Sequence, residues 1–202
     1  FTDKSKQGGG PLIDIGTHSL DLTLWMMNNY EPATVTGVTY NKLGTTLAPG
    51  NQGNAMGAWD PATYEVEDAA FAFVTMKDGS LITIDATWVL NSTEERCAAS
   101  YLCGTAAGAE LTGVGGSNDG KLYLNKVMGN KQVKIDVNTA AGGVDLFPGK
   151  KVQAGDVECK VWLDAIDGIG QLCVKPEQAF TVTKILDAVY ESARTGKQVV
   201  FE

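Results

Sequence analysis

The chain has 202 residues, of which 44% are hydrophobic, a composition typical of a soluble globular protein. Its formal net charge is −8 and it has no basic run, which argues against nucleic acids and anionic membranes as partners, because both require clustered Lys and Arg. No apolar run approaches the roughly 20 residues of a membrane-spanning helix, and the four cysteines form no C-x-x-C pair, so we expect a cytoplasmic protein with reduced thiols.

The first pattern along the chain predicts a helix over residues 11–29. The glycine triplet Gly8 to Gly10 forms its entry loop, and a proline suits its first turn. The pair Asn28-Asn29 and the following Pro32 end it.

One face of this predicted helix carries a narrow polar stripe. Residues at i, i+4, i+7 and i+11 share a face, and here they are Asp14, His18, Asp21 and Trp25. The stripe is flanked by apolar or small residues, and no Lys, Arg or Glu occurs in residues 11–29. This pattern differs from that of an ordinary solvated helix face.

His18, the only histidine of the chain, is the candidate proton donor or acceptor, because imidazole is the side chain that exchanges protons near neutral pH. Asp14, one turn earlier, would orient the ring and favour its charged form. At Gly10 the missing β-carbon would let a cofactor approach the helix start. The alternative is that His18 is an ordinary surface histidine. A metal site is disfavoured, since Asp14 and His18 alone leave an ion short of ligands.

The rest of the chain predicts strands and then two helices. The strands cover residues 33–41, 67–76, 80–90, 96–103, 109–112, 121–127 and 132–137. The turns Lys77-Asp78-Gly79 and Gly129-Asn130 join neighbouring strands as hairpins, and the helices cover residues 156–168 and 175–195. We therefore expect an α+β fold, a predominantly antiparallel open sheet with helices on one face. No strand, glycine-rich loop and helix follow one another as in dinucleotide-binding folds.

A long loop is expected over residues 44–63, and residues 51–64 carry two candidate substrate contacts, Trp59 and Tyr64. Aromatic faces stack on sugar rings, and polar tips bind their hydroxyls. The alternative is that each ring anchors the loop by local packing.

The segment from Gly8 to Trp25 resembles the signature G-G-G-x-x-x-D-x-G-x-H-x-x-D-x-x-x-W of the glucose-fructose oxidoreductase, inositol dehydrogenase and MocA family. The run Val66-Glu67-Asp68, the run Ala86-Thr87-Trp88 and the closing helices are also similar to that family. The likeness covers nearly the whole chain, but only the second of the family's two domains.

The resemblance implies that residues 1–202 are the C-terminal substrate-binding and oligomerisation domain of an NAD(P)-dependent dehydrogenase. Its substrate would be a sugar, a cyclitol or a related polyol, with Asp14 and His18 as catalytic residues. NAD or NADP would be bound mainly by an N-terminal nucleotide-binding domain absent from this chain. The family's catalytic lysine has no counterpart here, so the fragment alone is expected to be inactive.

The rival interpretation is a non-catalytic binding or oligomerisation module. Strand 80–90 has Ile82, Ile84 and Trp88 on one face and further apolar residues at the ends of the other. A sheet with two apolar faces predicts a homo-oligomer that forms through the open face. Both interpretations can hold together.

Overall fold

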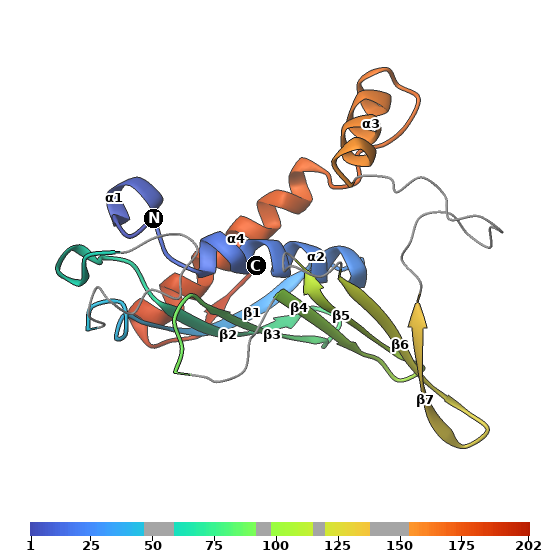
Figure 1. The fold of residues 1–202 in the computed structure, drawn as a ribbon, viewed down its shortest axis with the longest axis horizontal. Helices are drawn as coiled ribbons and strands as arrows, with labels where there is room; N and C mark the ends of the chain where they lie inside the picture. Colours follow the sequence, from blue (N-terminus) through green and yellow to red (C-terminus); the bar gives the residue numbers. More distant parts are fainter. Residues whose placement is uncertain (47–58, 92–97, 115–119, 138–153) are drawn as a thin grey trace. The chain divides into compact units, whose positions relative to one another are not determined.

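A computed structural model describes residues 1–46, 59–91, 98–114, 120–137 and 154–202. The chain divides into two compact units (Figure 1). The first contains residues 1–95 and 176–202, and the second contains residues 96–175.

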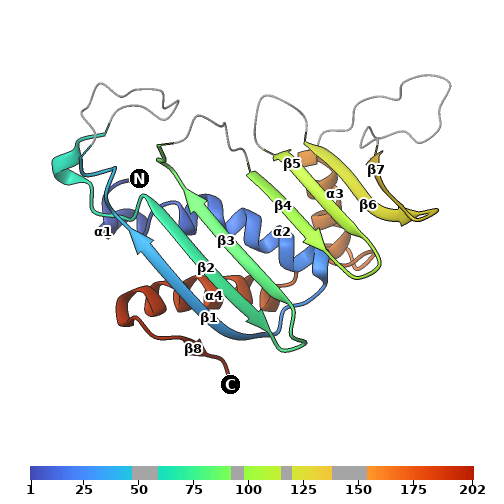
Figure 2. The ribbon, with the colours of Figure 1, turned by 90° about the horizontal axis from the view of Figure 1, so that it is seen from below.

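The first unit is a four-stranded antiparallel sheet with its helices on one face (Figures 1 and 2). Its helical elements are α1 (Lys4–Gln7), the π-helix η1 (Leu12–Gly16), α2 (Thr17–Met27), the 3-10 helix η2 (Pro61–Thr63) and α4 (Pro176–Thr195). Its strands are β1 (Pro32–Tyr40), β2 (Ala69–Met76), β3 (Leu81–Thr87) and β8 (Val199–Val200). They lie in the order β3-β2-β1-β8.

The core lies between the sheet and helices α2 and α4. Every second residue of the three long strands points toward it, and the helices contribute leucine and isoleucine side chains. The most buried members are Leu12, Leu24, Val35, Ala70, Val74, Ile185 and Val189. Helix α4 approaches β1 closely at Gly37, where a Cβ would lie 2.7 Å from Val189. There the Gly37 N–H donates to the Ser192 hydroxyl at 3.0 Å, so the missing side chain fixes the position of α4 on the sheet.

The other face of this sheet, which we call the outer face, is exposed and partly apolar. The register places Val38 beside Phe71 and Thr36 beside Phe73. Phe73 is 59% exposed and Leu81 is 56% exposed. The outer face is thus a mixture of exposed apolar side chains and threonines, whereas the inner face is almost entirely apolar and packs against the helices.

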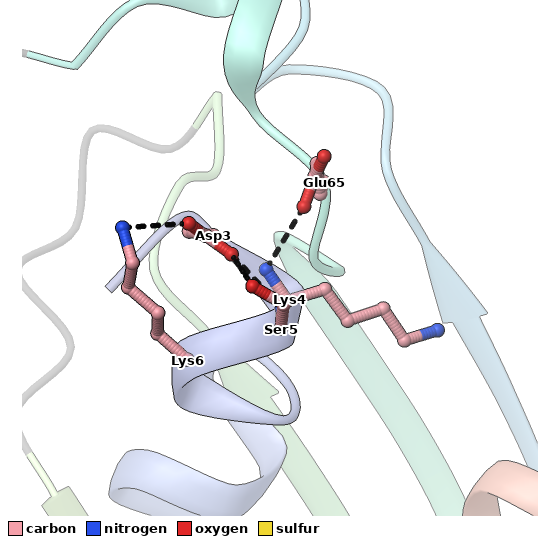
Figure 3. Close-up of polar contacts among 5 residues, drawn as sticks. All are labelled: Asp3, Lys4, Ser5, Lys6 and Glu65. Carbon is pink, nitrogen blue, oxygen red and sulfur yellow. Dashed lines mark hydrogen bonds and ion pairs between the residues drawn. The ribbon is translucent and has the colours of Figure 1, made fainter.

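The start of the chain is fastened to the first unit at α1 (Figure 3). Asp3 accepts hydrogen bonds from the backbone N–H of Ser5 at 2.9 Å and from its hydroxyl at 2.6 Å. These bonds, together with one from Lys6, lower the pKa of Asp3 to about 2. The Lys4 N–H donates to Glu65 at 3.1 Å, which links α1 to the segment before β2.

The second unit is also an antiparallel sheet, in the order β4-β5-β6-β7. Its elements are β4 (Ala98–Cys103), β5 (Gly108–Val114), β6 (Lys121–Met128), β7 (Lys131–Val137) and α3 (Ala154–Ile166). Gly129 and Asn130 both have positive φ, as a two-residue hairpin between β6 and β7 requires. Across the strands, Glu110 accepts hydrogen bonds from Asn125 and Lys134.

The α+β class, the antiparallel strands and both hairpins are confirmed. Two details differ from the expectation. The strands form two sheets of four rather than one, and the predicted helix over residues 11–29 begins with a π turn. The short elements α1 and β8 were not predicted, because neither is long enough to show a periodic pattern.

Candidate active site

Asp14 lies in η1 and His18 lies in the first turn of α2. The Gly16 N–H donates to the Pro11 carbonyl, five residues back, at 2.9 Å, and this bond defines the π turn. A Cβ on Gly16 would lie 3.2 Å from the Cβ of Ala86, so a glycine there lets the turn rest against β3. Such π turns are frequent at functional sites.

The predicted stripe lies on the accessible side of α2. His18 is exposed, Trp25 is 47% exposed, and Asp14 and Asp21 are partly exposed. On the opposite side of the helix, Leu24 is buried in the core. The structure therefore brings Asp14 and His18 onto one solvent-facing surface, where a ligand can reach both.

Among the described residues, no hydrogen bond joins His18 to Asp14. Asp14 is instead held from the sheet, because the indole Nε1–H of Trp88 donates to its Oδ2 atom at 3.0 Å. The second oxygen, Oδ1, accepts no hydrogen bond from the part of the chain that is described. One carboxylate oxygen of Asp14 is thus held by the protein, and the other has no hydrogen-bond partner among the described residues.

The start of η1 is held by the buried carboxylate of Glu67, which is 8% exposed. Its Oε1 atom accepts from the Leu12 N–H at 3.2 Å and from the Tyr190 hydroxyl at 2.8 Å. Burial and this hydrogen bond raise the pKa of Tyr190 above its usual value, so Tyr190 keeps its proton and stays a donor. Glu67 therefore links η1 to α4.

Two glycines of the triplet are packed against the rest of the protein. Gly9 and Gly10 are both buried. A Cβ on Gly9 would collide with the Tyr190 hydroxyl, and one on Gly10 would collide with the backbone carbonyl of Glu67. The structure thus gives these glycines a packing reason, and the role of Gly10 in cofactor binding stays a prediction.

Asp68, next to Glu67, is 2% exposed and organises the loop after β1. Its Oδ2 atom accepts from the backbone N–H groups of Lys42, Leu43 and Gly44 at 2.6, 2.7 and 2.9 Å. Three such donors satisfy a buried carboxylate, which would otherwise be costly.

Trp59 and Tyr64 pack together against this loop. Their rings meet edge to face with centroids 6.2 Å apart, and the Trp59 Nε1–H donates to the Gly44 carbonyl at 2.8 Å. Tyr64 is only 6% exposed, whereas Trp59 is half-buried. No described contact brings either ring to Asp14 or His18, and their part in substrate binding remains a prediction. The loop residues 47–58 lie outside the described ones.

Sequence reasoning did not find three residues that hold the site: Glu67, Trp88 and Tyr190. A usable signal was the pair Glu67-Asp68 directly before an apolar strand, because carboxylates beside a buried strand need internal donors. The described residues contain no group of three or more His, Cys, Asp and Glu placed to hold a metal ion. None of their helices is long and apolar enough to cross a membrane.

Comparison with known proteins gives a match over residues 2–201 to the family model described as "Oxidoreductase family, C-terminal alpha/beta domain". The chain is 29% identical over 199 residues to D-glucoside 3-dehydrogenase of Escherichia coli (strain K12). That alignment covers 98% of this chain and 51% of the relative, so the chain spans about half the length of that protein.

Solved structures with the same fold include levoglucosan dehydrogenase in its apo form, with a TM-score of 0.74 and 20% identity over 100% of this chain and 53% of that one. Another is the aldose-aldose oxidoreductase from Caulobacter crescentus complexed with glycerol, with a TM-score of 0.71 and 17% identity over 99% of this chain and 50% of that one. At such identities the likeness establishes the fold.

Proposed function

The chain belongs to the glucose-fructose oxidoreductase, inositol dehydrogenase and MocA family as its C-terminal alpha/beta domain, and from this premise we propose that it forms the substrate side of an NAD(P)-dependent sugar dehydrogenase. The observation that carries the proposal is the exposed face of η1 and α2, where Asp14 and His18 lie one turn apart. Its substrate class is a sugar, a cyclitol or a related polyol, with D-glucosides first, because a D-glucoside dehydrogenase is the curated relative that aligns over nearly the whole chain.

In this proposal His18 moves the proton of the substrate hydroxyl. As hydride leaves the carbon that bears the hydroxyl, one ring nitrogen of His18 takes the hydroxyl proton. The other ring nitrogen donates to Asp14 Oδ1, and the carboxylate stabilises the imidazolium that forms. Catalytic hydrogen bonds often tighten only when substrate binds, so this bond is expected in the substrate complex.

The described residues do not fit a dinucleotide site by themselves. Both sheets are antiparallel, and Gly9 and Gly10 pack against Tyr190 and Glu67. We propose that a nucleotide-binding domain, N-terminal to this one in the whole enzyme, holds the nicotinamide that accepts the hydride. We propose that in that assembly the segment around Gly10 adjoins the cofactor, and that this chain alone is inactive.

For the substrate, Trp59 is our candidate for stacking on a sugar ring, since its ring is half-buried and its N–H is already bound to Gly44. Tyr64 supports Trp59 by its edge contact. The free, exposed thiols of Cys103, Cys159 and Cys173 suit a reducing compartment, and we place the protein in the cytoplasm.

The test uses the chain joined to its nucleotide-binding domain. Oxidation of a methyl D-glucoside is followed as NADH or NADPH formation, with myo-inositol as the alternative substrate. His18→Gln keeps a polar side chain but removes proton exchange, and we expect kcat to fall by about a hundredfold or more. Ser19→Ala, the neighbouring position on α2, is the matched control and should keep kcat within about twofold. A His18→Gln enzyme with near-normal kcat would remove His18 from the mechanism.

A second function, assembly, is supported by the outer face of the first sheet. It carries exposed rings and aliphatic side chains across three strands: Val38, Tyr40, Phe73 and Leu81. Several large exposed apolar side chains gathered on one sheet face are typical of an interaction surface. We propose that a second copy of the chain covers it, sheet against sheet. Light scattering should then give twice the chain mass or more, and a strict monomer at micromolar concentration would contradict the proposal.

A further inference from the structure

We propose that Trp88 is a positioning residue, which fixes the Asp14 carboxylate in one orientation so that its second oxygen faces His18. The inference rests on the proposed function of Asp14 and His18. It concerns a residue 74 positions away from Asp14 in the chain, at the end of β3.

The contact that carries the inference is the hydrogen bond from Trp88 Nε1–H to Asp14 Oδ2 at 3.0 Å. An indole has a single donor and no acceptor, so the bond can form only with an oxygen turned toward the sheet. A partly exposed aspartate without such a donor would populate several rotamers, because nothing else among the described residues holds it. The bond therefore selects which carboxylate oxygen is occupied.

Trp88 is itself held in place. Its backbone N–H donates to the Asp68 carbonyl at 3.0 Å, and the edge-to-face contact with Phe1 has ring centroids 6.4 Å apart. Asp68 cannot easily shift, since its own side chain binds three backbone N–H groups. The indole donor is thus anchored to the backbone that precedes β2.

The backbone of Asp14 depends on the same support. Glu67, next to Asp68, binds the Leu12 N–H at the start of η1. One dipeptide, Glu67-Asp68, therefore fixes both the helix turn that carries Asp14 and the indole that holds its side chain. Both attachment points lie directly before β2, so the Asp14 carboxylate has little freedom to move. A preorganised site requires such restriction.

The consequence for chemistry concerns Asp14 Oδ1. With Oδ2 occupied by the indole, Oδ1 is the oxygen left to accept a hydrogen bond from the ring of His18, one turn along the helix. A bond between this carboxylate and an imidazolium is charge-assisted and fixes the ring tautomer. Without Trp88, Asp14 would spend much of its time turned away from His18.

The first test needs no activity and uses NMR on the chain. Three-bond couplings about χ1 of Asp14 should report one rotamer in the native protein and averaging between rotamers in Trp88→Phe, which keeps a ring but removes the donor. Trp162→Phe, in the second unit, is the matched control and should leave the Asp14 couplings unchanged. In parallel, Asp14→Ala should shift the indole N–H resonance of Trp88, while Asp21→Ala should not. This variant keeps the test usable if Trp88→Phe does not fold.

The second test uses the whole enzyme with a methyl D-glucoside. We expect Trp88→Phe to lower kcat about tenfold with KM within about twofold, the effect of losing one hydrogen bond to a charged group. In Asp14→Ala, the further change Trp88→Phe should cost less than threefold, because the indole then has no carboxylate left to position. Three results would each overturn the inference. They are additive losses of kcat in the double variant, Asp14 couplings in Trp88→Phe that still report one rotamer, and a Trp88 indole N–H resonance that does not shift in Asp14→Ala. If the enzyme oxidises no sugar, the proposed function fails, while the couplings still decide whether Trp88 positions Asp14.

Discussion

Replacing Asp68 should destabilise the first unit more than any exposed aspartate does. In Asp68→Ala, three backbone N–H groups lose their acceptor. Gly44 is buried, so its N–H stays unpaired, whereas Lys42 is exposed and Leu43 is half-buried, so water can replace part of what they lose. The Gly44 N–H is then a buried donor without a partner, and the bonds of Lys42 and Leu43 are only partly replaced by water. Together these losses should lower the free energy of unfolding by about 3 kcal/mol.

Asp68→Asn keeps an acceptor oxygen but loses the charge, and charge-assisted bonds are about twice as strong as neutral ones, so we expect about half of that loss. Asp60→Ala is the control. Asp60 is exposed and caps η2 with a single bond to the Ala62 N–H at 2.9 Å, and its removal should cost no more than about 1 kcal/mol.

Urea unfolding measures these losses, and amide hydrogen exchange locates them, with Gly44 as the amide that should lose most protection in Asp68→Ala. If Asp68→Ala unfolds within about 0.5 kcal/mol of the native chain, or if Gly44 keeps its protection, the carboxylate does not organise the loop as described.

Three further predictions follow from single contacts. Gly10→Ala should lower the free energy of unfolding by about 3 kcal/mol or more, because its Cβ would collide with a backbone carbonyl. The control Gly155→Ala has open space around it in α3 and should raise helix stability by up to about 1 kcal/mol. Equal effects of the two changes in urea unfolding would refute this prediction. The pKa of Asp3 is lowered, so its bonds to Ser5 persist below the ordinary value of 3.8 and are lost as the pH falls through about 2. The Ser5 amide resonance should titrate with that midpoint, and a midpoint near 3.8 would contradict it. Phe73→Glu should convert an oligomer to monomers in light scattering, because it buries a charge in the interface, and an unchanged mass would place the interface elsewhere.

Much of this fold was predictable because its patterns are local. The alternation along β2 and β3, the Lys77-Asp78-Gly79 turn and the apolar stripe of α4 each lie within a short window of sequence. The structure shows those elements close to the predicted bounds. The π turn was not predictable, because it depends on how closely Gly16 approaches Ala86 on a distant strand.

The candidate site divides in the same way. Asp14 and His18 were nominated from their spacing on one helix and from the family signature, and their catalytic role stays a prediction. Trp88 is joined to Asp14 across 74 residues, and no local pattern reports such a bond. The glycines at 9 and 10 and the ring of Tyr64 show the reverse case: their residue types suggested ligand contacts, while the fold gives them close packing against Glu67, Tyr190 and Gly44.

The central claim is that His18 transfers the proton at a sugar hydroxyl, and single-turnover kinetics test it most directly. The whole enzyme, loaded with its nicotinamide cofactor, is mixed with a saturating methyl D-glucoside, and the absorbance of the reduced cofactor is followed in one turnover. We predict that His18→Gln slows this phase by about a hundredfold or more while Ser19→Ala does not. Equal rates in the native enzyme and His18→Gln would contradict the account.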